Sequence, residues 1–349
     1  ARMRERPIAQ LTEALRAFGV RVVHLEGNDC PPIQVAPPEK LDQLAPSIEL
    51  PTTTSSQFIS ALMLIAPWLP HGLTLRLAGA ITSKPYIQMT ADLLARVGAR
   101  VQTSESLHII KIAPGADSLS TLDGTVGRGL PAFEIDVEPD ASGATYFWAA
   151  AALRPGRTIR VDGLDRRSFQ GDTRFPELLE RMGADVRASD ELHSEPNPWT
   201  EVTGPATLTP IDADLSDMPD TAMTLAACCV FAHGPSTLRG LGTLRVKETD
   251  RIAAMVNELT KLGLTVENPV PADSANHYDD PDAIRIIPPS GGLDCSPDAP
   301  PVHFDTYDDH RMAMAMALIA LQRPNVYIND PKCVAKTYPT FWAEFARLF

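Results

Sequence analysis

Cysteine is scarce in this sequence, with five residues in 349, an odd number. Cys228 and Cys229 are adjacent, and no pair has the C-x-x-C spacing that many zinc sites and redox motifs use. A disulfide framework is disfavoured as well, because small secreted scaffolds carry even numbers of cysteines. We therefore expect a protein of a reducing compartment, without structural zinc or disulfides.

Positive charge is also in short supply. Lys and Arg number 31 against 44 Asp and Glu, which gives a formal net charge of −13. Such an acidic balance argues against nucleic acid or an anionic membrane as the main partner. The apolar run at 312–321 is far shorter than the ~18 residues that suggest a membrane span, so we expect a buried helix there. The sequence also lacks GxGxxG, Walker A, HExxH and GxSxG signatures.

A repeat of about 80 residues organises the chain. At four places an amphipathic helical pattern ends at a glycine and a short strand-like run follows. We expect each glycine to adopt the left-handed conformation just past a helix end. These glycines are Gly19, Gly98, Gly183 and Gly263.

A second series has the same period. Stretches beginning near 55, 142, 220 and 309 have a polar entry and then apolar residues nearly all round, as in a capped core helix. Strand-like runs follow each stretch. Repeated units that cannot bury an apolar helix alone must pack together around it, which predicts an α/β architecture with several units per domain. The length suggests roughly two domains.

Three segments, at 193–205, 268–283 and 288–301, are rich in Pro and Asp or Gly. Such residues favour turns and interrupt regular elements, so we predict surface connections at all three.

Cations recur in the loops that precede the amphipathic helices, for example in "RVKETDR" at 245–251. Lys247 and Arg251 lie four apart at an apparent helix start, where like charges repel and cations oppose the helix dipole. An anion bound between them would remove the repulsion, and helix N-termini with nearby cations bind phosphates. The alternative is a solvated helix end in which Glu248 and Asp250 offset the two cations.

A second cationic motif, "YDDHRMAM" at 307–314, opens a buried helix with His310 and Arg311. A buried arginine is costly unless it is paired. The alternative to an anion-binding role is a capping cluster in which Asp308 and Asp309 pair with Arg311.

Two further motifs lie at apparent helix starts. Asp220 in "DMPDTAMT" is a candidate catalytic carboxylate, and the simpler interpretation is a helix N-cap. In "TTSSQF", Ser55 or Ser56 can cap a helix, while Gln57 offers both a donor and an acceptor.

These motifs together have a specific match. "SSQFISALMLIAP", "SKPYI", "QGDTRF", "MPDTAMT", "RVKETDR", "DHRMAMA" and "KCVAKTYP" occur in this order. From its first residue to its last, the chain resembles the EPSP synthase family of enolpyruvyl transferases. The resemblance implies two similar domains, each a threefold arrangement of βαβαββ units with the helices inside, an inside-out α/β barrel.

The resemblance also sets the expected domain limits. Residues 1–138 would hold part of the second unit and the third unit, and 139–349 the second domain with units four to six. The first one and a half units, with the family's Lys-Ser helix start, a second arginine and a Gly-rich loop, would then lie upstream of this chain. We accordingly expect the sequence to be the later part of a longer protein.

The activity implied is transfer of the enolpyruvyl group of phosphoenolpyruvate to the 5-hydroxyl of shikimate 3-phosphate. Phosphate is released in an addition–elimination through a tetrahedral intermediate. The resemblance implies no metal or organic cofactor, no nucleic-acid or membrane partner, and a cytoplasmic monomer.

The resemblance also assigns residues. Asp220 would be the base at the hydroxyl with Lys247 beside it, and Glu248 would take part in proton transfer to the methylene carbon. Shikimate 3-phosphate would be bound by Ser55, Ser56, Gln57, Ser83, Tyr86, Asp220, Thr243 and Lys247. Phosphoenolpyruvate would be bound by Arg2, Gln57, Arg251, His310, Arg311 and Lys336. Thr243 departs from the family's usual Asn, and its hydroxyl has a shorter reach.

Two alternatives remain open at this point. The related transferase that acts on UDP-N-acetylglucosamine carries a catalytic cysteine ahead of a motif like "RPI", and "ARMRERPI" at 1–8 has none. The second alternative, from another class, is a noncatalytic fragment or one that needs a complementing piece.

Overall fold

The computed structural model describes residues 2–36, 38, 40–51, 55–120, 126–189, 197–272 and 279–349. The chain forms two compact units, Ala1–Val137 and Glu138–Phe349, and each is described here by itself. In the part of the chain described, no helix combines the length and the apolar character needed to cross a bilayer.

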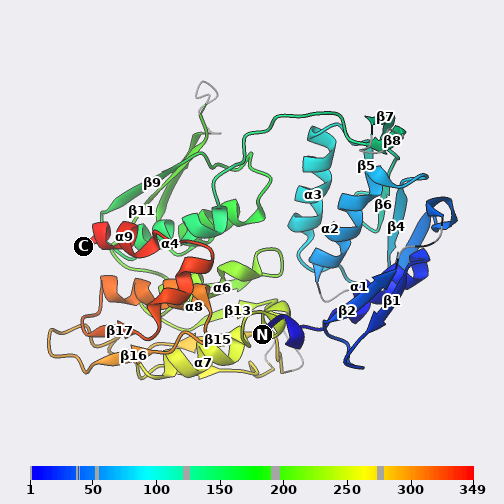
Figure 1. The fold of residues 1–349 in the computed structure, drawn as a ribbon. Coiled ribbons are helices and arrows are strands. Elements are labelled where there is room, and N and C mark those ends of the chain that lie inside the picture. The colour runs from blue at the N-terminus through cyan, green and yellow to red at the C-terminus, as the bar shows by residue number, and fades with distance from the viewer. Residues whose placement is uncertain are drawn as a thin grey trace. The chain divides into compact units, whose positions relative to one another are not determined.

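Unit 1 is built around one four-stranded sheet with the order β3-β4-β6-β5 (Figure 1). β3 runs parallel to β4, and the pairs β4–β6 and β5–β6 are antiparallel. The strands are β1 (Arg21–His24), β2 (Ile33–Ala36), β3 (Ser47–Leu50), β4 (Leu73–Leu77), β5 (Val101–Thr103), β6 (Ile109–Ile112), β7 (Ala116–Ser120) and β8 (Val126–Gly129). The helices are η1 (Arg2–Glu5), α1 (Ala9–Phe18), η2 (Leu41–Gln43), α2 (Ser56–Ile65), η3 (Ala66–Trp68) and α3 (Lys84–Arg96).

Unit 2 contains a sheet of the same pattern, β12-β13-β15-β14, together with β10-β11-β9 and the parallel pair β16-β17. Its strands are β9 (Thr158–Asp162), β10 (Asp185–Ala188), β11 (Trp199–Thr203), β12 (Asp212–Asp214), β13 (Ser236–Arg239), β14 (Thr265–Glu267), β15 (Ile284–Ile287), β16 (Val302–Phe304) and β17 (Val326–Ile328). The helices include α4 (Ala141–Ala152), η4 (Gly171–Arg174), α5 (Phe175–Arg181), η6 (Pro219–Thr221), α6 (Ala222–Cys229), η7 (Gly242–Val246), α7 (Arg251–Thr260), α8 (His310–Ala317), η8 (Leu318–Leu321), η9 (Pro331–Lys336), α9 (Phe341–Phe345) and η10 (Ala346–Leu348).

The repeat predicted from the sequence is confirmed and extended. Residues 47–112 and 212–287 each follow the order β-α-β-α-β-β and form sheets of identical pairing. The four predicted glycines all lie at positive φ, between 81° and 105°. The sequence analysis did not predict the leading strand of either unit, β3 or β12, because strands of four and three residues carry too little periodicity to be recognised.

The core of unit 2 forms around α4, α6 and α8, which lie together in Figure 1. Trp148 of α4, Met223 of α6 and Met312 of α8 are fully buried. A helix that is apolar all round is stable only when other elements cover every side of it. These three helices pack against one another and against the neighbouring strands. The predicted burial of these helices is confirmed.

The prediction that the helix beginning near residue 55 is buried on all sides is wrong for α2 of unit 1. Leu64 is 50% exposed and Ile65 41% exposed, although the opposite face, with Ile59 and Leu62, is buried. α2 packs against α3 and the sheet of its own unit, and the described residues of unit 1 contain only one complete βαβαββ unit. A single unit covers only one side of its helix.

The loop prediction at 193–205 is also wrong, because β11 lies within it as the central strand of β10-β11-β9. Trp199 and Val202 are buried there. The Pro- and Asn-rich stretch before the strand concealed it, and 190–196 lie outside the described residues, as do 273–278 in the second predicted loop. The loop predicted at 288–301 is confirmed as irregular chain.

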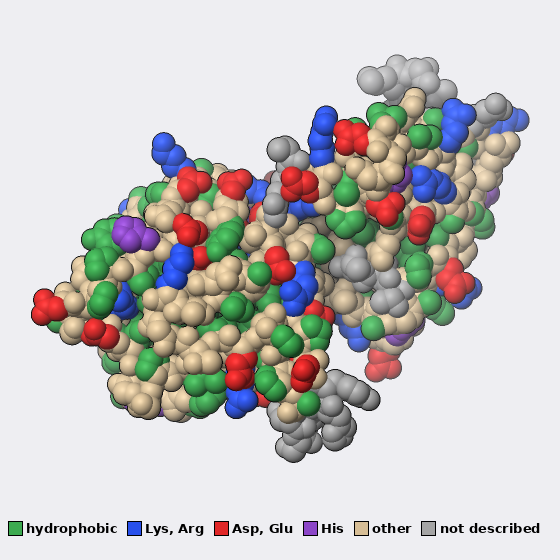
Figure 2. Space-filling model, turned by 90° about the horizontal axis from the view of Figure 1, so that it is seen from below, with side chains coloured by type: hydrophobic (Ala, Val, Ile, Leu, Met, Phe, Trp, Pro, Cys, Tyr) green, Lys and Arg blue, Asp and Glu red, His purple; other side chains and the backbone are tan. Residues whose placement is uncertain are grey.

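On the face that Figure 2 shows, the Lys and Arg side chains lie scattered among Asp and Glu. The described residues on this face form no basic stripe of the kind that nucleic-acid binders carry.

Candidate active site

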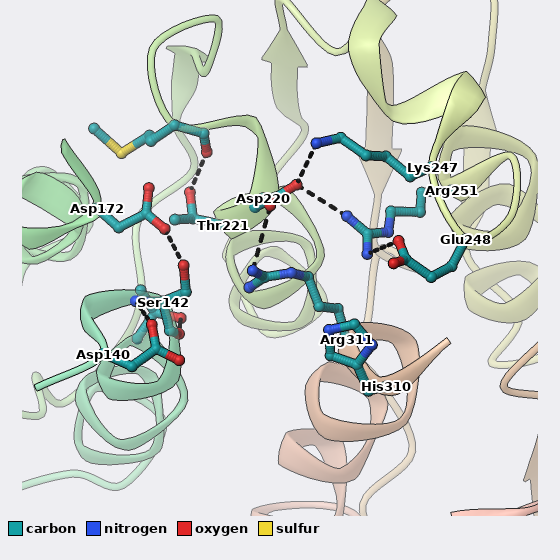
Figure 3. Close-up of polar contacts among 12 residues, drawn as sticks. Asp140, Ser142, Asp172, Asp220, Thr221, Lys247, Glu248, Arg251, His310 and Arg311 are labelled. Carbon is teal, nitrogen blue, oxygen red and sulfur yellow. Dashed lines mark hydrogen bonds and ion pairs between the residues drawn. The ribbon is translucent and has the colours of Figure 1, made fainter. Parts of the chain in front are cut away.

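Most of the candidate side chains predicted in unit 2 lie at or just before the N-terminal ends of its helices (Figure 3). Asp220 lies in η6, just before α6. Lys247 and Glu248 lie between η7 and α7, and Arg251 is the first residue of α7. α8 begins with His310 and Arg311, and Lys336 ends η9. Residues separated by more than a hundred positions thus form one cluster of acids and bases.

Arg251 is the centre of this cluster. Its Nε donates to Asp309 Oδ2 at 2.7 Å, and its terminal nitrogens donate to Asp220 Oδ1 and Glu248 Oε2, each at 2.9 Å. The side chain is 1% exposed. Three carboxylates offset the cost of burying the guanidinium. The repulsion between Lys247 and Arg251 therefore needs no ligand to relieve it, because Asp220 contacts both cations and Glu248 contacts Arg251. That the two cations bind an anionic ligand stays a prediction.

Asp220 binds three cations. Its oxygens lie 2.9 Å from Arg251, 3.3 Å from Arg311 and 3.5 Å from Lys247 Nζ. Burial alone would raise the pKa of this carboxyl, but the neighbouring cations outweigh it and lower the pKa to about 2. The interpretation of Asp220 as a helix cap is wrong, because η6 precedes α6 and Asp220 lies inside that turn.

Glu248 links the cluster to η9. One carboxylate oxygen accepts from Arg251, and the other accepts from Lys336 Nζ at 2.7 Å. Burial acts to raise the pKa of Glu248, but its bonds to these two cations prevail and hold the pKa well below its ordinary value. A proton donor or acceptor at this position is thus coupled directly to a lysine that is 55% exposed.

The two acids that flank the arginines have roles that differ from those expected. Asp309 does not pair with the guanidinium of Arg311; it caps α8 by accepting from the Arg311 backbone N–H at 2.9 Å and pairs with Arg251. Asp250 caps α7 through the Ala253 N–H and pairs with Arg245. Each acid therefore fixes the start of the helix that carries a cluster residue.

His310 and Thr243 have less defined places. The His310 ring is buried, Nδ1 has no hydrogen-bond partner among the described residues, and burial lowers the pKa of the imidazole. Thr243 lies in η7 with a buried hydroxyl, also without a partner in the described part of the chain. Neither contacts a charged residue of the cluster through its polar side-chain atom at hydrogen-bond distance.

The remaining predicted residues belong to unit 1, at the starts of α2 and α3. Ser55 caps α2 by accepting from the Gln57 N–H at 3.3 Å, and Ser56 is buried while Gln57 is exposed. Ser83 is buried at a φ of 52° just before α3, and its carbonyl accepts from the Tyr86 N–H. Three of these residues are serines at or next to a helix start.

Arg2 completes the set of predicted residues. It begins η1, but its side chain lies outside the part of the chain that the structure describes.

Sequence reasoning missed Asp172, which lies in η4 next to the start of α4. Ser142 donates its hydroxyl hydrogen to Asp172 Oδ2, and Oδ1 is buried without a partner among the described residues (Figure 3). Burial raises the pKa of Asp172 to about 6. The signal was present in "QGDTRF", where an acid follows a glycine between polar neighbours, but the motif alone does not indicate burial.

We expect Asp172→Asn to change how stability depends on pH. The folded-state pKa of Asp172 lies above the value of 3.8 for an unperturbed Asp. The contribution of this carboxyl to the free energy of unfolding is therefore full below pH 3.8 and is lost as pH rises through about 6. The amide introduced by Asp172→Asn cannot ionise, so the variant does not lose this part of its unfolding free energy as pH rises. Relative to the unsubstituted protein, the variant should gain roughly 2 kcal/mol of unfolding free energy between about pH 4.5 and 7.5.

Urea unfolding at several pH values measures this gain. Asp185→Asn, at an exposed strand position that pairs with Arg187, provides the control and should show no such trend. A difference between Asp172→Asn and the unsubstituted protein that stays constant with pH would mean that Asp172 titrates normally.

Comparison with known proteins gives a consistent result. The family model described as EPSP synthase (3-phosphoshikimate 1-carboxyvinyltransferase) matches residues 1–345. A 3-phosphoshikimate 1-carboxyvinyltransferase from Ralstonia nicotianae is 41% identical over 352 residues, covering 99% of this chain and 72% of the relative. One from Shewanella denitrificans is 38% identical over 347 residues, with 99% and 71% covered.

Solved structures share the fold. EPSP synthase from Acinetobacter baumannii superimposes with a TM-score of 0.71 at 22% identity, covering 99% of this chain and 71% of that one. The enolpyruvyl transferase NikO from Streptomyces tendae gives 0.68 at 17% identity, with 98% and 71% covered. Because the family model matches residues 1–345 of the 349 in this chain, the chain belongs to the EPSP synthase family.

Proposed function

We propose that this protein transfers the enolpyruvyl group of phosphoenolpyruvate to the 5-hydroxyl of shikimate 3-phosphate and releases phosphate. The observation that carries the proposal is the cluster in which Asp220 and Glu248 meet Lys247, Arg251, Arg311 and Lys336. Two phosphorylated substrates and a carboxylate require several cations, and the reaction moves two protons. Family membership and relatives about 40% identical, named for this reaction, support the same assignment.

The reaction needs a base at the hydroxyl and an acid at the methylene carbon. Asp220 takes the proton of the 5-hydroxyl as its oxygen bonds to C2 of phosphoenolpyruvate, while Glu248 passes a proton to C3. In the second step the bond from C2 to the phosphate oxygen breaks and the new methyl group loses a proton. A carboxylate with a pKa of about 2 is a weak base, so we propose that Lys247, 3.5 Å away, shares the transfer.

The cationic side chains differ in solvent exposure, and we use this difference to propose the order in which they contact phosphoenolpyruvate. Arg311 is 17% exposed and Lys336 more so, and we assign the first contacts with phosphoenolpyruvate to these two. Arg251 is enclosed by carboxylates, so it contacts this substrate only after Glu248 or Asp220 turns away. His310, Gln57 and Arg2 complete the proposed set for phosphoenolpyruvate.

We assign shikimate 3-phosphate to hydroxyl and amide groups at the starts of α2 and α3, together with polar residues of unit 2. Helix N-termini offer free N–H groups that suit a phosphate. The residues are Ser55, Ser56, Gln57, Ser83, Tyr86, Asp220, Thr243 and Lys247. We further propose a cytoplasmic monomer, and that units 1 and 2 correspond to the two family domains.

Initial rates of phosphate release test the proposal, with this chain and with any longer native form that contains it. We expect release only when phosphoenolpyruvate and shikimate 3-phosphate are both present. Release from phosphoenolpyruvate alone, or in response to UDP-N-acetylglucosamine, would refute it. Release by a longer form but not by this chain would identify these residues as a fragment that needs a complementing piece.

A further inference from the structure

The loop that joins β16 to α8 has a strained backbone. Tyr307 and Asp308 lie at φ 56° and 55°, so two consecutive residues other than glycine adopt the left-handed conformation. This conformation is costly for residues with a Cβ, above all for an aromatic one. Such strain persists only where the surroundings over-determine it. The next residue along the chain is Asp309, which binds Arg251 and caps α8.

A buried glutamate holds this loop. Glu258 of α7 has no exposed side-chain surface, and its Oε1 accepts from the Tyr307 hydroxyl at 2.7 Å. Its Oε2 accepts from the Asp305 N–H at 2.9 Å and from Lys261 Nζ at 2.6 Å. One carboxylate therefore binds both the backbone just before the strained turn and the side chain of its first strained residue.

The same helix anchors the loop a second time. Arg251 begins α7, and Glu258 follows seven residues later, two turns along the same face. Arg251 binds Asp309, and Glu258 binds Tyr307. The two anchors lie about 10 Å apart along α7 and fix both the place and the direction of the loop that delivers Asp309 and Arg311 to the cluster.

An apolar residue would suffice at position 258 if α7 needed only packing, since a buried carboxylate gains little net stability from its partners. The specific hydrogen bonds from a strained loop to Glu258 favour a role for this residue in fixing the conformation of the loop. We propose that Glu258 and Tyr307 are positioning residues, which hold the turn at 305–309 so that Asp309 and Arg311 meet Arg251 and Asp220. The link to catalysis rests on the proposed function, whereas the link to loop geometry does not.

Tyr307→Phe tests the proposal because it removes one hydroxyl. We expect the KM for phosphoenolpyruvate to rise about tenfold, with the KM for shikimate 3-phosphate changed less than about twofold. Amide hydrogen exchange without substrates should accelerate about tenfold at 305–312 and stay unchanged in β13. Tyr327→Phe, on the exposed strand β17, is the matched control and should alter neither measurement.

A second variant separates positioning from general stability. Glycine adopts φ near 55° without strain, so Asp308→Gly added to Tyr307→Phe should bring the KM for phosphoenolpyruvate back to within about threefold of its original value. Uniformly faster exchange in Tyr307→Phe, with both KM values raised alike and no rescue, would overturn the proposal in favour of a merely structural role. Unchanged exchange at 305–312 would overturn it as well.

The proposed function can fail independently of this inference. If neither the unsubstituted protein nor any longer native form that contains it releases phosphate from the two substrates, while Tyr307→Phe still speeds amide exchange at 305–312 alone, the positioning of the loop is supported and the assigned reaction is wrong.

Discussion

Asp220→Asn is expected to lower turnover by about 100-fold or more at saturating concentrations of both substrates. The amide keeps the size of the carboxyl but cannot accept the proton of the 5-hydroxyl. It also leaves Lys247, Arg251 and Arg311 without the anion that all three contact. The KM values should change less than turnover does, because the side chains that we propose to contact the substrate phosphates remain.

Steady-state phosphate release measures this loss. Asp212→Asn is the control, since Asp212 pairs with Arg239 at the surface of the same unit and exposed pairs contribute little. The low pKa of Asp220 keeps it ionised throughout the neutral range, so the loss should be the same at about pH 6 and about pH 9. Turnover within about threefold of the unsubstituted protein would exclude a role in proton transfer.

Arg251→Met should be the most destabilising single change in the cluster, at roughly 3–5 kcal/mol of unfolding free energy. Methionine has similar length but no charge, so Asp309 would remain fully buried without a cation, and Glu248 and Asp220 would each lose a partner. Urea unfolding followed by tryptophan fluorescence measures the loss, because Trp148 lies buried in the core of unit 2.

A double variant isolates the cause. Arg251→Met with Asp309→Asn removes both the cation and its most buried anion, so the loss should be smaller than the sum of the two single changes. Arg347→Met, which breaks an exposed pair with Glu344, should cost less than about 1 kcal/mol. A loss below that size for Arg251→Met would mean that the buried acids find other partners and that Arg251 does not organise the cluster.

The repeat was readable from the sequence because its signals are local. A glycine after an amphipathic helix and an apolar helix after a polar entry each depend on a few neighbouring residues, and Gly183 and α6 follow these rules. β11 escaped recognition because Pro and Asn beside it suggested a loop, and its strand conformation depends on pairing with β9 and β10. The exposed face of α2 depends on which neighbours surround it, and its own pattern does not contain this information.

The sequence predicted which residues belong to the candidate site, but it did not predict which of them contact one another. Motifs indicated Asp220, Lys247 and Arg311, whereas Arg251 and Asp309 are 58 residues apart and no local spacing links them. The buried acids Asp172 and Glu258 escaped recognition for the same reason, since an acid on an amphipathic helix or in a polar loop is usually solvated. Only the packing of α7 against its neighbours makes Glu258 a buried group.

Deuterium incorporation tests the central claim most directly. With phosphoenolpyruvate and shikimate 3-phosphate in D2O, addition of a solvent-derived deuteron to C3 forms a methyl group, and elimination removes one of its hydrogens. We predict deuterium in the methylene group of the product and of recovered phosphoenolpyruvate, detected by mass spectrometry, with the unsubstituted protein, and an appearance of label about 100-fold slower with Asp220→Asn. Phosphate release that leaves the methylene group unlabelled would contradict addition–elimination at this cluster.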